Sequence, residues 1–164
     1  MPTIHLIEGP VGAGKSTFAY RLSRERGAPR LVLDDWMARL FRPDRPDEGL
    51  WPWYQARKDR CIDQIWDVTE ELLDLDSDVV LELGLVQRAA REAFYARVDA
   101  AGRELRVLVL DAPREVRRER VRRRNTARGE TFAMEVSDEV FEQASDAWEA
   151  PDETECAERG IEFP

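Results

Sequence analysis

A complete phosphate-binding motif constrains this chain more than any other feature. Residues 9–16 read GPVGAGKS and match G-x-x-x-x-G-K-[ST], directly after the apolar run 3–8 and before a stretch with helical spacing of apolar residues. Glycines in such a loop let the backbone turn tightly and point successive N–H groups inward, and the following helix N-terminus adds positive potential. The sequence therefore predicts a nucleoside triphosphate site between a strand and a helix.

The residues of this loop are predicted to divide the work of holding the nucleotide. Lys15 is placed to reach the β- and γ-phosphates, where it also assists catalysis, and the Ser16 hydroxyl is placed to ligate Mg²⁺. Further contacts to the nucleotide are expected from Gly9, Val11, Gly12, Ala13, Gly14 and Thr17. ATP and Mg²⁺ are therefore the expected cofactors.

Charge and cysteine content limit the partners and the compartment. The 164 residues contain 34 acidic and 25 basic side chains, a net charge of -9, which matches nucleic-acid backbone and anionic lipid poorly. A small-molecule partner is therefore favoured, and nucleic acid and membranes are not expected. Two cysteines cannot form a disulfide framework, and neither a signal peptide nor an apolar run of membrane-spanning length precedes them, so we expect a cytoplasmic protein.

Apolar strands alternate with helical stretches along the whole chain, which predicts an α/β fold with a parallel sheet covered on both faces. We expect one domain over 1–164, with a substrate-side helical insertion at 42–60 and a lid at 117–136 that includes a mobile loop from Asn125 to Val136. The expected strands are 3–8, 30–33, 78–83, 105–110 and a short one near 161–163. The expected helices are 36–41, 52–75, 86–101, 114–124 and one capped by Ser137.

Three carboxylates follow predicted strands, where ligands of open α/β sheets bind. Asp34 is preferred as the general base that takes a proton from a substrate hydroxyl, with Asp35 as the second candidate and a substrate contact. An equally good interpretation of Asp35 is a cap of the helix beginning at Trp36. Glu82 is expected to hold Mg²⁺ directly or through water, and a salt bridge to Lys15 is the alternative.

Two further groups of residues are candidates for binding. Arg120 and Arg124 lie four residues apart in an arginine-rich helix, so they share a face and could close over the triphosphate, with Arg124 assisting transfer. A run such as this is otherwise a solvated surface. The candidate acceptor pocket is a group of aromatic and basic side chains before the third strand: Trp36, Arg39, Trp51, Trp53, Tyr54 and Arg57. The aromatic members could equally pack the insertion onto the sheet.

Several segments resemble the small P-loop kinases of the zeta-toxin and chloramphenicol-phosphotransferase type. They are GPVGAGKST at 9–17, LDDWM at 33–37, VVLELG at 79–84, RVRRRN at 120–125 and WEAPDE at 148–153. The resemblance implies a P-loop NTPase three-layer sandwich with a five-stranded parallel sheet of order 2-3-1-4-5. The strand-three segment departs from the pattern, because Glu82 stands where relatives commonly have Asp.

The same resemblance implies roles for individual residues. Asp34 matches the acidic base, Arg120 matches an arginine near adenine, and Arg124 matches one near phosphate. Arg91, or less well Arg88, matches an arginine that meets substrate, and Pro151 lies in a segment like the loop that borders the adenine.

The sequence thus predicts an ATP- and Mg²⁺-dependent phosphotransferase acting on a hydroxyl of a small molecule. Three other functions fit parts of the pattern: a polynucleotide 5′-hydroxyl kinase, a nucleotide-dependent binding or regulatory module, and a toxin kinase that modifies a nucleotide sugar. Charge disfavours the first, and binding alone needs neither the acidic pair nor the lid arginines. The chain has no N/T-K-x-D guanine-recognition motif, which argues against a GTPase switch.

Overall fold

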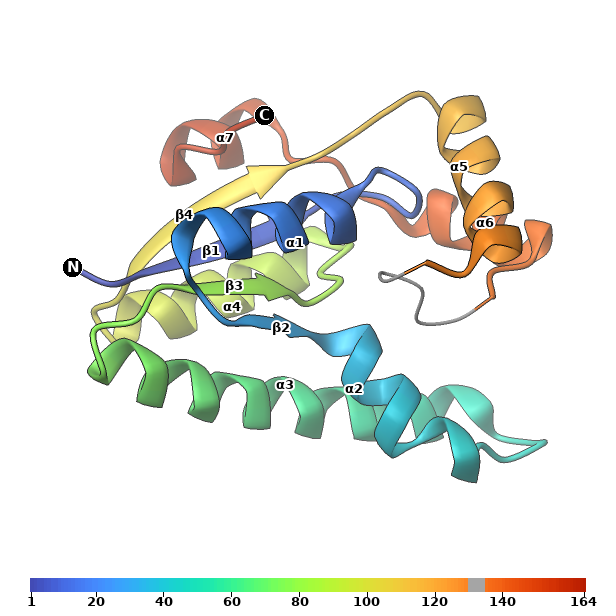
Figure 1. Ribbon diagram of the computed structural model, residues 1–164, viewed down its shortest axis with the longest axis horizontal. Helices are drawn as coiled ribbons and strands as arrows, with labels where there is room; N and C mark the ends of the chain where they lie inside the picture. The colour runs from blue at the N-terminus through green and yellow to red at the C-terminus, as the bar shows by residue number, and fades with distance from the viewer. Residues whose placement is uncertain (130–134) are drawn as a thin grey trace.

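A computed structural model describes residues 1–129 and 135–164 (Figure 1). Within these residues the strands form one parallel sheet of four in the order β2-β3-β1-β4, which confirms the α/β prediction. The strands are β1 (Thr3–Glu8), β2 (Arg30–Val32), β3 (Val79–Glu82) and β4 (Glu104–Val109). β1 lies at the centre, with Ile4 level with Val79 on one side and Leu105 on the other.

Helices cover both faces of this sheet (Figure 1). They are α1 (Lys15–Arg26), α2 (Leu33–Leu40), the 3₁₀ turn η1 (Arg42–Asp44), α3 (Leu50–Asp74), α4 (Arg88–Ala100), α5 (Arg114–Ala127), α6 (Asp138–Ala147) and α7 (Glu153–Arg159). Among the helices so described, none is long and apolar enough to cross a membrane.

The alternation of side chains along β1 builds two cores. Ile4 and Leu6 point to a large apolar cluster that includes side chains of α3 and α4, whereas Ile7 points to a smaller cluster beneath α1. All three side chains are fully buried. The phosphate loop therefore starts from the most completely buried strand end of the molecule, which fixes its position.

The prediction of a fifth strand near 161–163 is wrong, although this segment does lie beside β4. Near the C-terminus the structure has only an isolated parallel bridge from Leu108 to Glu162, with hydrogen bonds that Val109 N donates to Glu162 O (2.8 Å) and Glu162 N donates to Val107 O (3.0 Å). A longer ladder is prevented because Gly160 turns in the left-handed region and Pro164 has no N–H to donate. The segment adds one link beside β4.

The helix after β2 begins earlier than predicted, at Leu33 and not at Trp36. Asp34 and Asp35 consequently lie in its first turn. Neither caps it, because the N-cap position is Val32 and no side-chain cap bond forms. The capping interpretation of Asp35 is therefore wrong, and both carboxylates are exposed at the carboxyl end of the sheet, where their charge suits a helix N-terminus.

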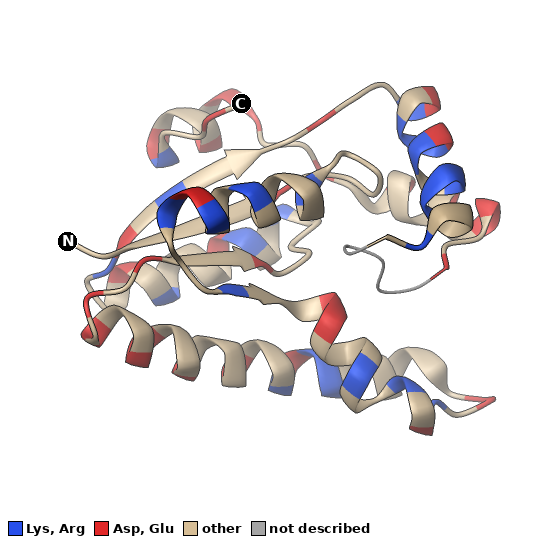
Figure 2. Ribbon diagram, in the orientation of Figure 1, with Lys and Arg blue, Asp and Glu red and all other residues tan. Residues whose placement is uncertain are grey.

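Ion pairs join α5 to α6 on the side away from the phosphate loop, and Figure 2 shows the basic α5 beside the acidic segments of α6. Arg114 bonds Glu142 and Asp146, Arg118 bonds Glu142, and Arg122 bonds Asp138. The interpretation of these arginines as a solvated surface is therefore incomplete, because their partners lie on the next helix.

The predicted lid, 117–136, is part helix and part loop. α5 continues to Ala127, beyond the predicted end at 124, and Asn125 anchors the return of the chain by donating to Val136 O (2.7 Å) and accepting from Val136 N (3.0 Å). Residues 130–134 of the predicted mobile loop lie outside the described residues.

A buried ion pair ties α4 to α7. Arg91 and Glu155 are both fully buried and form two hydrogen bonds, Nε to Oε1 (2.6 Å) and Nη2 to Oε2 (2.9 Å), while Tyr95 Oη donates to the same carboxylate (3.1 Å). Arg91 Nη1 also donates to the carbonyl of Leu85. The predicted substrate contact of Arg91 is not available in this arrangement, because its donors are used inside the protein.

We predict that Glu155→Ala lowers the free energy of unfolding by about 3–5 kcal/mol, because it leaves the Arg91 charge buried without its partner. Urea denaturation measures this. The matched control is Arg88→Ala, which removes an exposed arginine paired with Asp152 on the same pair of segments and should cost below about 1 kcal/mol. Equal losses in the two variants would contradict the account.

Candidate active site

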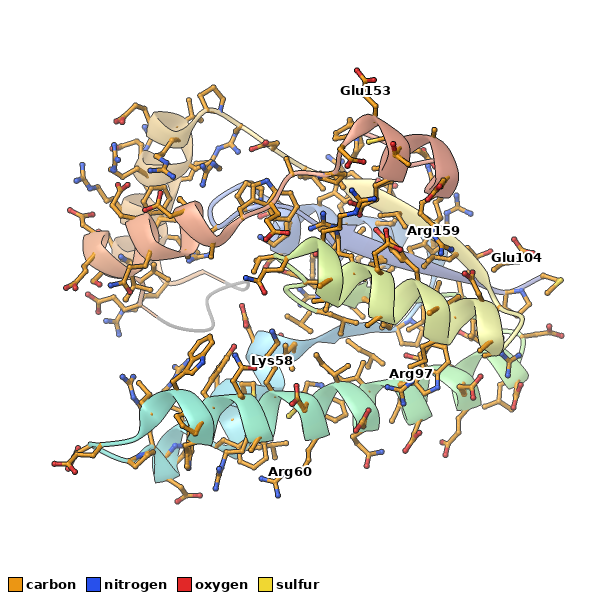
Figure 3. All side chains as sticks on the ribbon, turned by 180° about the vertical axis from the view of Figure 1, so that it is seen from behind. Lys58, Arg60, Arg97, Glu104, Glu153 and Arg159 are labelled. Carbon is orange, nitrogen blue, oxygen red and sulfur yellow. The ribbon has the colours of Figure 1, made fainter. Side chains whose placement is uncertain are left out.

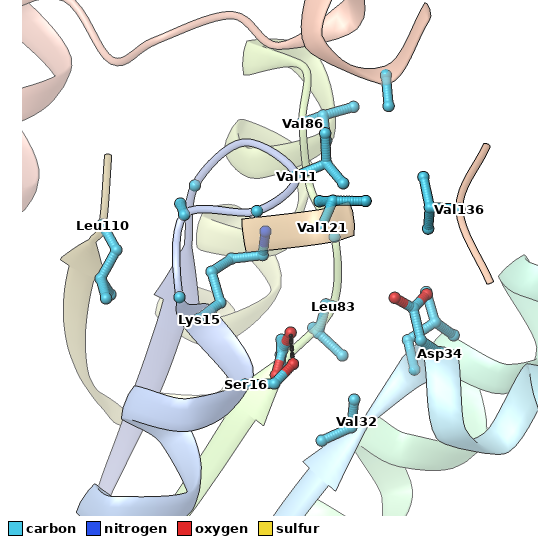
Figure 4. Close-up of a pocket in the computed structure, with 18 of the residues that line it drawn as sticks. Val11, Lys15, Ser16, Val32, Asp34, Leu83, Val86, Leu110, Val121 and Val136 are labelled. Carbon is cyan, nitrogen blue, oxygen red and sulfur yellow. Dashed lines mark hydrogen bonds between the residues drawn. The ribbon is translucent and has the colours of Figure 1, made fainter. Parts of the chain in front are cut away.

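A cleft of about 1120 Å³ opens at the carboxyl ends of β1, β2 and β3. The phosphate loop and Asp34 of α2 line it (Figure 4), together with Glu82 of β3 and with Arg120 and Arg124 of α5. The structure thus brings together the loop, the preferred base, the metal carboxylate and the two selected arginines. A cavity of this size accommodates a nucleotide beside a second small molecule.

Two glycines of the loop are required by close packing. A Cβ on Gly9 would lie 2.1 Å from the carbonyl oxygen of Leu110, and one on Gly12 would lie 2.6 Å from that of Arg117. Both residues also have positive φ, at 148° and 77°. The loop is therefore held against the end of β4 and against α5, so its N–H groups have fixed directions.

Arg117 strengthens the contact between the phosphate loop and α5. It is buried, and its guanidinium donates to the carbonyls of Ala112 (2.9 Å) and Val11 (3.0 Å) and to Ser145 Oγ (3.0 Å). One side chain thus connects the phosphate loop, the start of α5 and α6. The base of the predicted lid is therefore fixed to the loop.

Lys15 and Ser16 start α1 and face two acidic groups. Lys15 Nζ donates to the carbonyl of Pro10 (2.9 Å), and Ser16 Oγ donates to Glu82 Oε1 (2.8 Å), the dashed bond beside Ser16 in Figure 4. Burial lowers the pKa of Lys15, while the charges of Glu82, Glu8 and Asp34 oppose that shift. Glu82 is bonded to the serine, so the alternative of a Glu82–Lys15 salt bridge is wrong for this structure.

The Ser16–Glu82 pair fits a magnesium ion. The second carboxylate oxygen of Glu82, Oε2, is buried without a hydrogen-bond partner, and burial raises the pKa of this carboxyl against the influence of Lys15 and Ser16. A hydroxyl and a carboxylate beside a phosphate loop are the hard oxygen donors that Mg²⁺ takes when phosphates and water supply its other ligands.

Glu8 is a buried acid for which the sequence analysis predicts no role. It ends β1 directly before the loop, is fully buried, and neither of its carboxylate oxygens has a hydrogen-bond partner. Burial raises its pKa to about 8, although the charges of Lys15 and Arg91 lower it. Glu8 is therefore mostly protonated at neutral pH. Its place within a buried strand, next to the motif, is the only sequence signal that could have singled it out.

Arg120 and Arg124 differ from the other arginines of α5. Among the described residues neither has an acidic partner within ion-pair distance, and both line the cleft. Arg120 donates to the carbonyl of Ala13 (3.3 Å), and Arg124 Nε is buried without a hydrogen-bond partner. Two such cations beside a phosphate loop form an anion site that the protein itself leaves uncompensated.

The predicted acceptor residues separate onto two faces of α3. Trp53 and Arg57 do not line the cleft: the Arg57 guanidinium lies 4.3 Å from the Trp53 ring centroid and 5.8 Å from that of Phe41. Trp36 lines a separate small hollow, and Arg39, Arg91 and Pro151 also lie outside the cleft lining. Packing is therefore the observed role of Trp36 and Trp53.

The cleft instead receives the opposite face of α3. Trp51, Tyr54, Gln55 and Lys58 line it, at the spacing i, i+3, i+4 and i+7 that places side chains on one side of a helix. This periodicity was readable in the sequence and separates these residues from Trp53 and Arg57. Tyr54 lies close to the preferred base, because the negative charge of Asp34 is the second cause, after burial, that raises the pKa of Tyr54 to about 12.

A family described as an AAA domain matches residues 4–151. The chain belongs to this family. Membership implies a nucleotide-binding phosphate-loop domain and agrees with the cleft geometry. No curated protein matches the chain.

Three solved structures are similar to this AAA-domain chain. Chaetomium thermophilum Kti12 in complex with ADP-AlF3 is 15% identical, with a TM-score of 0.69 over 98% of this chain and 88% of that one. A gluconokinase from Sinorhizobium meliloti 1021 is 18% identical, with a TM-score of 0.59 over 99% and 81%. A chain of the Pnkp1/Rnl/Hen1 RNA repair complex is 20% identical, with a TM-score of 0.64 over 89% of this chain and 43% of its own length. At these identities the likeness concerns the fold.

We predict that Lys15→Ala removes the thermal stabilisation that Mg²⁺·ATP gives the parent protein, which is about 2.7 kcal/mol at a ligand concentration of about 100 Kd. Thermal unfolding with and without ATP measures it. The control is Arg123→Ala, which removes a cation paired with Glu119 outside the cleft and should keep the full stabilisation. ATP stabilisation that survives in Lys15→Ala would contradict the assignment.

Glu8→Gln should make the protein more stable than the parent as pH rises. The unfolded carboxyl ionises near 4.5 and the folded one near 8, so the parent loses stability across this interval, whereas glutamine does not titrate. The difference in unfolding free energy should be smallest near pH 4.5, grow up to about pH 8 and then level off. Denaturation curves across this range test it, and a constant difference would be contrary to a neutral buried Glu8.

Proposed function

We propose that this protein is an ATP-dependent phosphotransferase that moves the γ-phosphate to a hydroxyl of a small molecule. The observation that carries the proposal is the position of Asp34, an exposed carboxylate in the first turn of α2 that lines the same cleft as Lys15 (Figure 4). Arg124, whose Nε has no hydrogen-bond partner among the described residues, also lines this cleft. Binding a nucleotide does not need this acid, whereas phosphate transfer to an alcohol does. The resemblance to zeta-toxin and chloramphenicol-phosphotransferase kinases supports the same reaction.

In the proposed reaction Asp34 accepts the proton of the acceptor hydroxyl as its oxygen attacks the γ-phosphorus. The new O–P bond forms while the bond from the γ-phosphorus to the bridging oxygen breaks, and ADP leaves with that electron pair. Lys15 and Arg124 balance the charge on the transferred group. Arg120 contacts the nucleotide beside the phosphate loop.

Ser16 and Glu82 would hold Mg²⁺, which neutralises phosphate charge when bound. The contribution of the chain itself is to fix these two oxygen donors, since their hydrogen bond and the buried position of Glu82 allow little movement. The loop N–H groups orient the phosphates, and the lid side of the cleft limits access of water.

The second candidate is a polynucleotide 5′-hydroxyl kinase. The likeness to a chain of the Pnkp1/Rnl/Hen1 RNA repair complex favours it. The net charge of -9 opposes it, because affinity for a long polyanion comes from many phosphate contacts. We therefore prefer a small acceptor.

Asp34→Asn should lower the rate of phosphate transfer roughly 10²-fold or more while leaving ATP affinity near the parent value, because the amide cannot accept the proton. Transfer from labelled ATP to a panel of nucleosides, sugars, aminoglycosides, phenicols and 5′-hydroxyl oligonucleotides measures the rate, and calorimetry measures the affinity. Asp35→Asn is the matched control and should have a mild effect. A severe Asp35→Asn with a mild Asp34→Asn would exchange their roles, and labelling of oligonucleotides alone would favour the second candidate.

A further inference from the structure

The face of α3 that enters the cleft is distinct from the phosphate-binding side. Trp51 and Tyr54 stack with ring centroids 6.1 Å apart and planes inclined by 21°. Trp51 is 69% exposed although it is a large apolar side chain at the wall of a cavity. Its outer face therefore has no partner among the described residues and offers a flat surface to a ring.

This aromatic pair lies beside the proposed base. Asp34 and Tyr54 line the same cleft, and the negative charge of Asp34 contributes, after burial, to the raised pKa of the Tyr54 hydroxyl. A molecule that brings a hydroxyl to Asp34 from the open side of the cleft therefore passes along the Trp51–Tyr54 stack.

Lys58 lies two turns further along the same face, about 10 Å from Trp51 at a rise of about 1.5 Å per residue. Figure 3 shows Lys58 on the side of α3 that faces the rest of the molecule, while Arg60 points to the opposite side. No hydrogen bond or ion pair joins Lys58 to another described residue, although most arginines outside the cleft have acidic partners. The cleft thus keeps a cation uncompensated at a distance from the phosphate loop.

The opposite wall of the cleft is mainly aliphatic. Val136 and, from α6, Val140 and Ala144 line it. Apart from the amide of Gln143, such a wall offers few hydrogen bonds to the many hydroxyls of an open-chain polyol, whereas it can contact the face of a ring.

We propose that the acceptor carries a flat ring and one anionic group on either side of the reacting hydroxyl, with the ring on Trp51 and the anion on Lys58. This proposal rests on the proposed function, and it names the class of its acceptor. A polyhydroxy acid without a ring, such as the substrate that the gluconokinase name specifies for that protein, lacks the group that Trp51 receives.

Calorimetric titration with three probes tests each element of the proposal. Uridine 3′-monophosphate has a flat ring, an anionic group and a free hydroxyl; uridine lacks the anion, and gluconate lacks the ring. In the presence of Mg²⁺·ADP, uridine 3′-monophosphate should bind at least about tenfold more tightly than either of the others, the scale of one lost stacking contact or one charged hydrogen bond.

The variants separate the two contacts. Trp51→Ala should weaken uridine 3′-monophosphate and uridine about tenfold and leave gluconate unchanged, whereas Lys58→Ala should weaken the two anionic probes. Arg60→Ala, on the other side of α3, and Trp53→Ala, which removes an indole outside the cleft, should change none of the three affinities. Absence of binding by uridine 3′-monophosphate, gluconate binding as tightly, or equal affinities in Trp51→Ala and the parent would each overturn the proposal.

Transfer of labelled phosphate in the same mixtures tests the proposed function separately. Binding that depends on Trp51 and Lys58 without phosphate transfer to any acceptor would support the acceptor surface and contradict the kinase. Phosphorylation of uridine 3′-monophosphate at an unchanged rate in both Trp51→Ala and Lys58→Ala would support the kinase and overturn the acceptor surface.

Discussion

The backbone of the phosphate loop lies against the end of β4 and against α5 with no room for a side chain at Gly9 or Gly12. This contact determines the position of everything that acts in the cleft. It aims the N–H groups of the loop, sets Lys15 and Ser16 on the first turn of α1, and brings Arg117 of α5 close enough to bond both the loop and α6. The lid arginines therefore reach the anion site because the loop and the lid share one packed interface.

Within the described part of the chain, the arginines of α5 that lie outside the cleft are paired with acidic side chains, whereas those that line the cleft are not. Outside it, Arg114, Arg118 and Arg122 are paired with acidic side chains of α6, so they hold two helices together and attract no ligand. Inside it, Arg120 and Arg124 have no acidic partner among the described residues, and the buried acids near Lys15 have raised pKa values because they are desolvated. The cleft thus holds cations without acidic partners beside the phosphate loop, and a triphosphate would neutralise their charge.

The sequence predicted the elements that depend on local pattern, and it failed where tertiary partners decide. The loop, the four strands and the Ser137 cap follow from glycine spacing, apolar runs and capping chemistry, and all are observed, whereas the order of the strands is an expectation from the family resemblance. Arg91 was misassigned because only the fold brings Glu155 to it from 64 residues away. The prediction of Trp53 and Arg57 as acceptor contacts is wrong because the aromatic and basic side chains of the insertion do not form one patch: helical spacing places these two on the face of α3 opposite Trp51.

Calorimetric titration with Mg²⁺·ATP, ADP and AMP tests the central claim, that the loop with Arg120 and Arg124 is built for a triphosphate. The claim predicts affinity that rises with each added phosphate, with ATP binding more than about tenfold more tightly than AMP, since each charged hydrogen bond contributes about 1.5–3 kcal/mol. Equal affinities for AMP and ATP, or no binding of ATP, would contradict it.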